Sequence, residues 1–358
     1  MWSLSTISTA IHDWLNQTFN PTWAMIMEMV IAGIAVIGLF ATLGLVLVLM
    51  ERRVAAWMQI RLGPNRVGPK GMLQSFADTL KLLVKEGLTP NGADKFLFNL
   101  APFIAMIVAM LLMAPIAFAK NFQLWDLNIG VLYISAVSSI MVISILMAGW
   151  ASNNKYSLMG AMRSGAQIVS YELSAGLSVL TIVVLTGSLN INDIINAQAD
   201  GWWIFKGHIP VIISFIIFII AVTAETNRAP FDLAEAESEL TAGFHTEYSG
   251  MKFALFFLAE YINVFIVCAI GATLFLGGWM PFHIGHWEAF NHAMDYVPSS
   301  IWFFGKTFFL IFVIMWFRWT FPRLRIDQLL SLEWKYLLPI SMFNLLLVTA
   351  IAILGWHF

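Results

Sequence analysis

The chain has 358 residues, of which 59% are hydrophobic and 11% are charged, and its formal net charge is −2. Soluble domains average roughly 45–50% apolar and about 25% charged residues, so this composition excludes an ordinary soluble enzyme and a disordered chain. The single cysteine, Cys268, excludes a disulfide framework and a cysteine-ligated zinc or iron–sulfur centre within this chain. The lack of a basic surplus argues against nucleic acid as a partner. The class that remains is an all-α polytopic membrane protein.

Eight segments are apolar for long enough to cross a bilayer, which takes about 20 residues. We expect the membrane-spanning helices at 24–50, 96–119, 131–150, 164–187, 207–225, 253–280, 301–321 and 336–356. They make 1–358 a single transmembrane domain. The first 23 residues carry no basic flank and no small-residue cleavage site, so they do not resemble a signal peptide.

The Lys and Arg residues are distributed unevenly between the two sides of these spans. Sixteen of them fall on the side reached after odd-numbered spans, and three fall on the other side. Because positive charge is enriched in cytoplasmic loops, both termini are predicted to lie outside. The loops predicted to face the cytoplasm are 51–95, 151–163, 226–252 and 322–335.

The first inner loop combines turns with an amphipathic segment. Two Gly-Pro pairs, at 63–64 and 68–69, favour turns. The segment 71–86 then places apolar residues on one face and polar residues on the other, which predicts a helix lying in the membrane interface. Two interpretations stay open: the helix is docked on a partner subunit, or it borders an opening for an amphipathic, lipid-like substrate.

The third inner loop is strongly acidic. Its six carboxylates within 23 residues are Glu225, Asp232, Glu235, Glu237, Glu239 and Glu247. Pro230 and the Asp232–Glu235 spacing predict a helix start with Asp232 as N-cap. On such a helix Asp232, Glu235 and Glu239 share a face, with Glu237 roughly opposite. The alternative is a solvated acidic surface.

Two glutamates lie within predicted spans, and a third lies at the inner mouth of another. Glu172 and Glu260 are expected about 10–12 Å inside the membrane, with Glu225 at the end of its span. Burying an ionised carboxylate there costs several kcal/mol of free energy unless it is paired with a cation or hydrated. We therefore predict a chain of protonatable groups, with separate structural hydrogen bonds as the alternative. Lys306 is expected either to snorkel outward or to end a proton path.

The outer side carries most of the histidines, including His283, His286 and His292. No carboxylate or cysteine completes a recognisable metal-ligand spacing with them. We therefore expect no metal site.

Several motifs carry a resemblance to a known family over nearly the whole chain. They are Glu51-Arg52-Arg53, the stretch 61–69, the stretch 149–156, the acidic stretch 224–240 and the stretch 321–328. Their residues are similar to those of the H subunits of bacterial NADH:quinone oxidoreductase, respiratory complex I. The mitochondrial counterpart is core membrane subunit 1 of that complex.

This resemblance implies a membrane-arm subunit of a proton-pumping translocase. It implies a quinone chamber bordered by Arg52, Arg61, Arg228, Phe231, Arg318 and Arg325. It also implies proton coupling through Glu172, Glu225, Asp232, Glu235, Glu237 and Glu260, with Glu239 as a further candidate. Quinone reduction is expected to shift the acidic loop, and that change is expected to pass to the buried glutamates and into partner subunits.

The implied partners are the peripheral quinone-module subunits on the cytoplasmic side, small membrane subunits alongside, and the lipid bilayer. FMN and iron–sulfur clusters are expected in those partners, and no redox cofactor is expected on this chain. The quinone is expected to be ubiquinone, although the residues do not distinguish it from menaquinone. The implied location is the bacterial inner (plasma) membrane.

Two other functions fit part of the pattern. The membrane subunit of an energy-converting hydrogenase shares the acidic loop, but that enzyme delivers electrons to protons. The stretch 61–69 and the amphipathic helix favour the quinone enzyme over it. A stand-alone proton-coupled transporter explains the spans and the buried acids, but it leaves the long inner loops unexplained.

Overall fold

The computed structural model describes residues 12–120, 122–233, 237–283 and 287–355, and it is almost entirely helical. Within these described residues, eight helical segments are long and apolar enough to cross a membrane, which confirms the predicted class. They are α2 (Pro21–Met58), α4 (Lys95–Met113), α5 (Gly130–Ala151), α6 (Lys155–Thr186), α9 (His208–Glu225), α11 (Gly250–Phe275), α13 (Ser299–Thr320) and the last span Ile326–Ile353. The last span consists of α14 (Ile326–Leu332), a π-helical turn η3 (Glu333–Leu337) and α15 (Leu338–Ile353).

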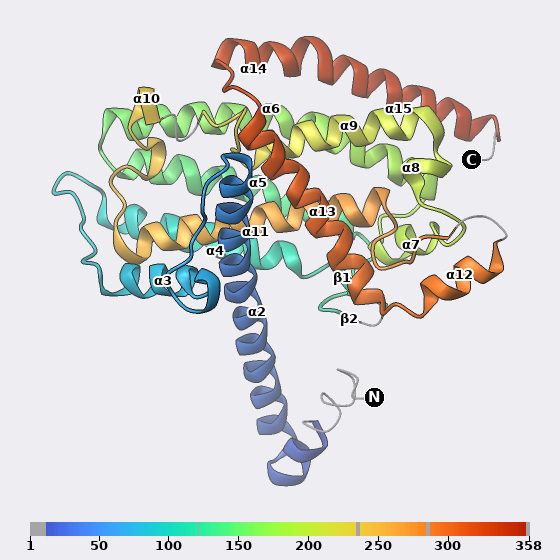
Figure 1. The fold of residues 1–358 in the computed structure, drawn as a ribbon, viewed down its shortest axis with the longest axis horizontal. Coiled ribbons are helices and arrows are strands. Elements are labelled where there is room, and N and C mark those ends of the chain that lie inside the picture. Colours follow the sequence, from blue (N-terminus) through green and yellow to red (C-terminus); the bar gives the residue numbers. More distant parts are fainter. Residues whose placement is uncertain (1–11, 121, 234–236, 284–286, 356–358) are drawn as a thin grey trace.

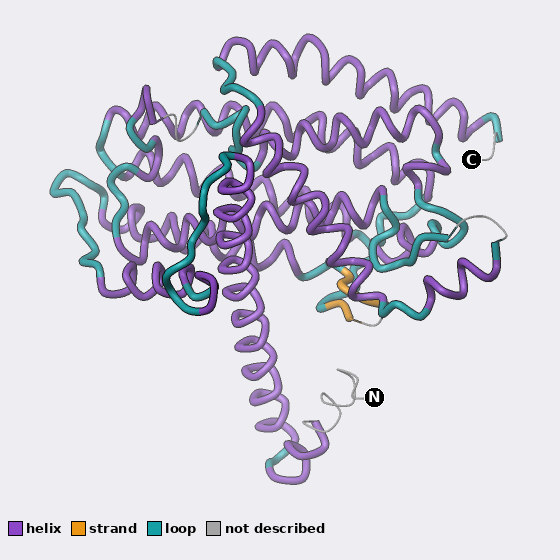
Figure 2. The backbone as a smooth tube through the Cα atoms, in the orientation of Figure 1, coloured by secondary structure: helices purple, strands orange, loops and turns teal. Residues whose placement is uncertain are grey.

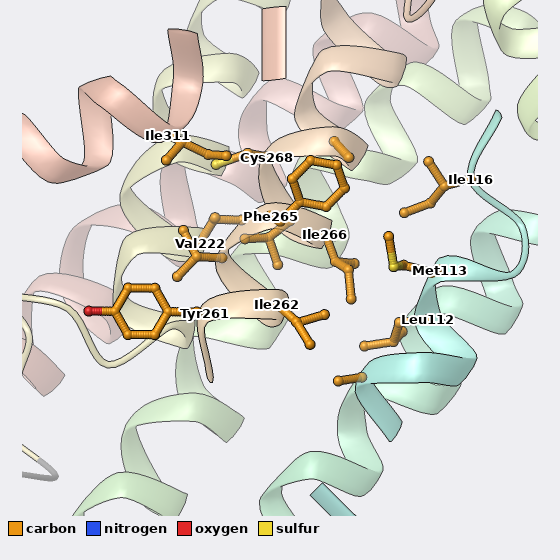
Figure 3. Packing of buried hydrophobic residues seen from close by; sticks show 14 of the residues in the cluster. Leu112, Met113, Ile116, Val222, Tyr261, Ile262, Phe265, Ile266, Cys268 and Ile311 are labelled. Carbon is orange, nitrogen blue, oxygen red and sulfur yellow. The ribbon is translucent and has the colours of Figure 1, made fainter. Parts of the chain in front are cut away.

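Helix α11 lies at the centre of the bundle. In its most apolar window 61% of the residues are buried, against 18% for α2. Figure 3 shows Leu112 of α4, Val222 of α9 and Ile311 of α13 on different sides of the α11 side chains, which include Ile262, Phe265 and Ile266. Because α11 packs against several other spans, including α4, α13, α2 and α9, its place in the bundle also fixes the positions of the polar residues that it carries.

Most of the long helices run roughly alongside one another, whereas α13 crosses them obliquely (Figure 1). Helix α15 packs on α6 and α9, and the amide of Asn344 donates to the carbonyl of Pro210 and the hydroxyl of Ser214 at 2.9 and 2.7 Å. Helix α2 crosses the others, and its N-terminal half extends beyond them (Figure 1). That half of α2 is almost entirely exposed within this chain.

Short elements gather at the two ends of the bundle (Figures 1 and 2). One end holds η1 (Pro69–Gly71), α3 (Gln74–Val84), α10 (Glu237–Leu240) and η2 (Gly243–His245). The other end holds the antiparallel strands β1 (Ala117–Ala119) and β2 (Phe122–Gln123), with α7 (Ile191–Asn196), α8 (Trp203–Lys206) and α12 (Glu288–Asp295).

The three largest differences from the predicted helix boundaries lie at the end of α2, the start of α6 and the start of the last span. Helix α2 continues to Met58 because no Gly or Pro interrupts it before Gly63, so Glu51, Arg52 and Arg53 lie on a helix. The predicted loop 151–163 is wrong over most of its length, because the Asn154 side chain accepts from the Tyr156 backbone and caps α6 at 2.9 Å. The predicted loop 322–335 is largely the helix α14.

The amphipathic helix is present as α3, and its apolar residues are exposed within this chain. The predicted acidic helix differs more. Asp232 is not an N-cap, because Leu233, which directly follows it, is not helical. Its buried carboxylate instead binds an arginine from another segment, which outweighs the local capping signal. Glu235 lies outside the described residues.

Candidate functional site

A cluster of four charged side chains lies where α2, α11, α13 and the segment after α9 meet. At its centre Glu51 accepts from Arg228 Nη1 at 3.2 Å and also from Arg318 Nη1. The Nε of Arg228 lies 3.4 Å from Glu260 Oε1. We call Glu51, Arg228, Glu260 and Arg318 the inner charge cluster. It joins four segments that are far apart in the sequence.

Arg228 is buried, as Glu51 is, and it links both carboxylates of the cluster. Its side chain is 6% exposed, and its guanidinium carbon lies 4.3 Å from the centre of the Tyr261 ring. Burial by itself would lower the pKa of Arg228, but the carboxylates of Glu51 and Glu260 outweigh burial and hold this pKa above its ordinary value. Its Nη2 has no hydrogen-bond partner in the described part of the chain. The cluster therefore retains an unused donor.

Glu225 lies between the inner charge cluster and a larger cavity. A cavity of about 30 Å³ is bordered by Glu225, Glu260 and Asn263. A second cavity, of about 290 Å³, is bordered by Glu225, Glu172 and many apolar side chains. The two cavities share Glu225, so they arrange the three glutamates in the order Glu260, Glu225, Glu172.

Glu172 has hydroxyl partners instead of cations. The hydroxyls of Ser138 and Ser139 on α5 donate to its Oε1 at 3.4 and 2.5 Å. No ion pair of Glu172 is found among the described residues. A carboxyl group with hydroxyl neighbours beside a cavity has room to exchange a proton with water.

Asp232 and Phe231 lie close together in sequence but have different surroundings. Asp232 accepts from Arg323 Nη2 at 2.9 Å. Phe231 packs against Tyr171 with ring centres 5.5 Å apart, and its carbonyl accepts from Gln167 at 2.7 Å. Phe231 therefore belongs to a second apolar cluster on α6.

The structure does not gather all of the predicted arginines. Arg52 pairs with Asp78 on α3. Arg61 is exposed at the end of α2 and donates to Gln59 at 2.6 Å, and Arg325 is exposed at the start of α14. Only Arg228 and Arg318 share a carboxylate. The six predicted chamber residues thus occupy several places in this chain.

The predicted acids are likewise divided. Glu172, Glu225 and Glu260 follow one another through the cavities, and Asp232 lies in the segment just after Arg228. Glu239 is largely exposed and accepts from Arg163 at 2.7 Å. Glu235 lies outside the described residues, as does the side chain of Glu237.

Sequence reasoning misses the central role of Glu51. It places Glu51 in a loop, although the uninterrupted helical stretch before Gly63 would have placed it on α2. It also misses Tyr261 and Arg323, because an aromatic residue in a span and a basic residue after one are both common.

Lys306 does not snorkel to the surface. Its ammonium donates to the carbonyls of Leu276, Gly278 and Met280 at 2.5, 2.9 and 2.6 Å, and it lies 4.2 Å from the Trp202 ring centre. It therefore caps the C-terminal end of α11.

The histidines predicted on the outer side do not form a metal centre among the described residues, where no group of three or more potential ligands is found. His283 lies 3.0 Å from Asp295, and His286 falls outside the described residues.

Comparison with known proteins extends these observations. Residues 30–349 match the family described as NADH dehydrogenase. The chain is 56% identical to the H subunit of the NADH-quinone oxidoreductase of Bacteroides thetaiotaomicron, with both sequences covered completely. It is 48% identical to the protein of the same name from Brevibacillus brevis, over 92% of this chain and 95% of the relative. The protein of that name from Carboxydothermus hydrogenoformans is 46% identical, over 95% and 93%.

Proposed function

Because this chain belongs to the NADH dehydrogenase family, we propose that it couples quinone reduction to proton translocation as the H subunit of an NADH-quinone oxidoreductase. Quinone is the substrate of that complex, and the other subunits of the complex are the partners of this chain. The chain contributes part of the quinone chamber and a series of half-buried carboxyl groups that border internal cavities. The order Glu260, Glu225, Glu172 beside the inner charge cluster is the observation that carries this proposal.

The chamber is proposed on the side of α3 and the inner end of α2. The exposed apolar face of α3, which includes Leu73, Phe76 and Leu80, suits the entry of an isoprenoid tail from the bilayer. Arg52 is held beside α3 through Asp78. Arginines near the quinone head group would favour the charge that develops on reduction. The exposed Arg61 and Arg325 are available to partner subunits or to the head group.

Coupling is proposed to begin at the inner charge cluster. A negative charge on the quinone, or the uptake of a proton by it, would change how strongly Arg228 pairs with Glu51 and with Glu260. Opposite charges a few ångströms apart interact strongly in a buried site. Glu260 borders the same small cavity as Glu225, and Glu225 borders the larger cavity with Glu172. Protonation changes would pass along this series, and the acidic loop from Asp232 to Glu239 would feed it.

The wider assembly follows from the same assignment. We infer that FMN and iron–sulfur clusters are held by peripheral subunits on the cytoplasmic side, and that the quinone is ubiquinone. We place the chain in the bacterial inner membrane with both termini outside. The exposed outer half of α2 suits contact with lipid or with small membrane subunits.

The test uses the intact complex, purified through a tag on this chain from its native membrane. NADH-driven reduction of a short-chain quinone and proton uptake into vesicles are measured for the wild type and for Glu225→Gln. The amide keeps the size of the side chain but does not ionise. We expect coupled turnover to fall at least about tenfold while the subunits still co-purify.

Glu86→Gln is the matched control, because Glu86 is exposed and near α3, and it should turn over like the wild type. Wild-type turnover and pumping in Glu225→Gln would contradict the coupling role. Hydrogen evolution by the wild-type complex without quinone reduction would assign the chain to the hydrogenase-type enzymes instead.

A further inference from the structure

Glu333 is a buried carboxyl group that the proposed function does not use. It opens the π-helical turn η3 in the last span, and its side chain is completely buried. The sequence prediction places it in an inner loop, apart from the other acids. A π-helical turn inserts one extra residue into the helical repeat and so changes which residues face the neighbouring helix.

The surroundings of Glu333 supply one hydrogen bond. The Ser174 hydroxyl on α6 donates to its Oε1. Its Oε2 is buried without a hydrogen-bond partner in the described part of the chain. The neighbouring apolar cluster includes Tyr171, Leu329 and Leu337. No Lys, Arg or His forms an ion pair with Glu333 among the described residues.

The other titratable or charged groups near this cluster either bind a different partner or are exposed. The Tyr171 hydroxyl donates to the Leu329 carbonyl at 3.0 Å. Arg325, Asp327 and Lys335, in the same span, are exposed. The loop that packs on the cluster carries Asp232, which Arg323 pairs at 2.9 Å. Helices α9 and α15 present only non-ionisable side chains here.

Glu333 is also separate from the glutamate series of the proposed site. Ser174 follows Glu172 by two residues on α6, so their side chains point to nearly opposite faces of this helix. Glu172 faces the serines of α5, whereas Ser174 faces the last span. Helix α6 therefore lies between the two carboxyl groups.

We propose that Glu333 is a second proton-binding site, whose neutral carboxylic acid joins the last span to α6 through Ser174. A buried carboxylate without a cation costs several kcal/mol, whereas the neutral acid loses only hydrogen bonds. The ligand is a proton and not a metal ion, because one carboxyl group and one hydroxyl supply too few ligands for a metal, and no group of three or more potential metal ligands is found among the described residues. This site does not depend on the proposed quinone chemistry.

The test is infrared spectroscopy of the intact purified complex at about pH 6 and about pH 9. The difference between wild type and Glu333→Gln should show loss of a carbonyl band of a protonated carboxylic acid at the lower pH. This band should be absent from the wild type at the higher pH. Ser174→Ala should shift the band to higher frequency, because the carbonyl loses its hydrogen bond.

Glu86→Gln is the control, and it should leave the protonated-acid band unchanged because Glu86 is exposed. Should Glu333→Gln fail to assemble, the Ser174→Ala shift identifies the band in a folded complex. The proposal is overturned if Glu333→Gln removes only carboxylate bands at about pH 6. It is also overturned if neither variant changes the protonated-acid region.

Discussion

The buried charges of the inner charge cluster and of Lys306 are stabilised in different ways. In the inner charge cluster, Arg228 and Arg318 share the carboxylate of Glu51, and Arg228 also reaches Glu260. At the other end of the bundle, the ammonium of Lys306 is stabilised mainly by hydrogen bonds to three backbone carbonyls. Carboxylates change charge when they bind protons, but backbone carbonyls do not. The first arrangement can therefore respond to protonation, whereas the second holds α11 and its following turn in place.

The largest effect is expected at the inner charge cluster. Arg228→Gln removes the cation shared by the buried Glu51 and the half-buried Glu260, and it leaves Glu260 without its partner. Breaking such a pair from one side typically costs about 3–5 kcal/mol. We expect a large loss of assembled complex and no coupled activity in what remains, measured by co-purification and quinone reduction.

Arg66→Gln serves as the control for this change, because Arg66 is exposed in the same inner region. Normal assembly and a normal melting temperature in Arg228→Gln would show that the cluster is not held by this arginine.

A smaller effect of a different kind is expected at Lys306. Lys306→Met keeps the apolar stem but leaves three carbonyls without their donor. We expect a loss of about 2–3 kcal/mol of stability, seen as a lower melting temperature of the complex. Quinone reduction per assembled complex should stay at the wild-type rate. A selective loss of proton pumping, with the melting temperature unchanged, would instead make Lys306 part of a proton path. Lys120→Met, at an exposed site, controls for the loss of charge.

The smallest effect is expected on stability when the pH is lowered and His245 becomes protonated. This side chain packs against Phe244 and Phe253. Burial lowers the pKa of His245 to about 4, whereas the unfolded chain binds this proton near pH 6.5. Between these values the unfolded state binds more protons, so stability falls as the pH is lowered from about 6.5 to about 4. The loss is about 2 kcal/mol, because the side chain is only partly buried and the shift is discounted for solvent.

His245→Gln should flatten this pH dependence of the melting temperature. An equal fall in the wild type and in His245→Gln would assign the effect to other groups.

Hydropathy locates all eight spans because the bilayer imposes one length and one polarity on each of them. It does not locate helix ends, which depend on a single cap such as Asn154 or on the first helix breaker after Glu51. Motif matching identifies Arg228, Glu225 and Glu260 as residues of interest. It does not predict which residues lie in contact, because contacting residues can be far apart in the sequence, as Glu51 and Arg318 are at a separation of 267 positions. Glu333 gives no signal, since one carboxylate beside a tryptophan and a lysine is typical of an interface.

The long helix α2 has a mechanical consequence. It is anchored to the bundle by its C-terminal half, where Glu51 lies, while its N-terminal half contacts little else in the described part of this chain. From Glu51 to Pro21 the helix axis is about 45 Å long. A rotation of about 5° at the anchored end would move the far end sideways by about 4 Å. Helix α2 would therefore convert a small rotation at Glu51 into a much larger displacement at Pro21.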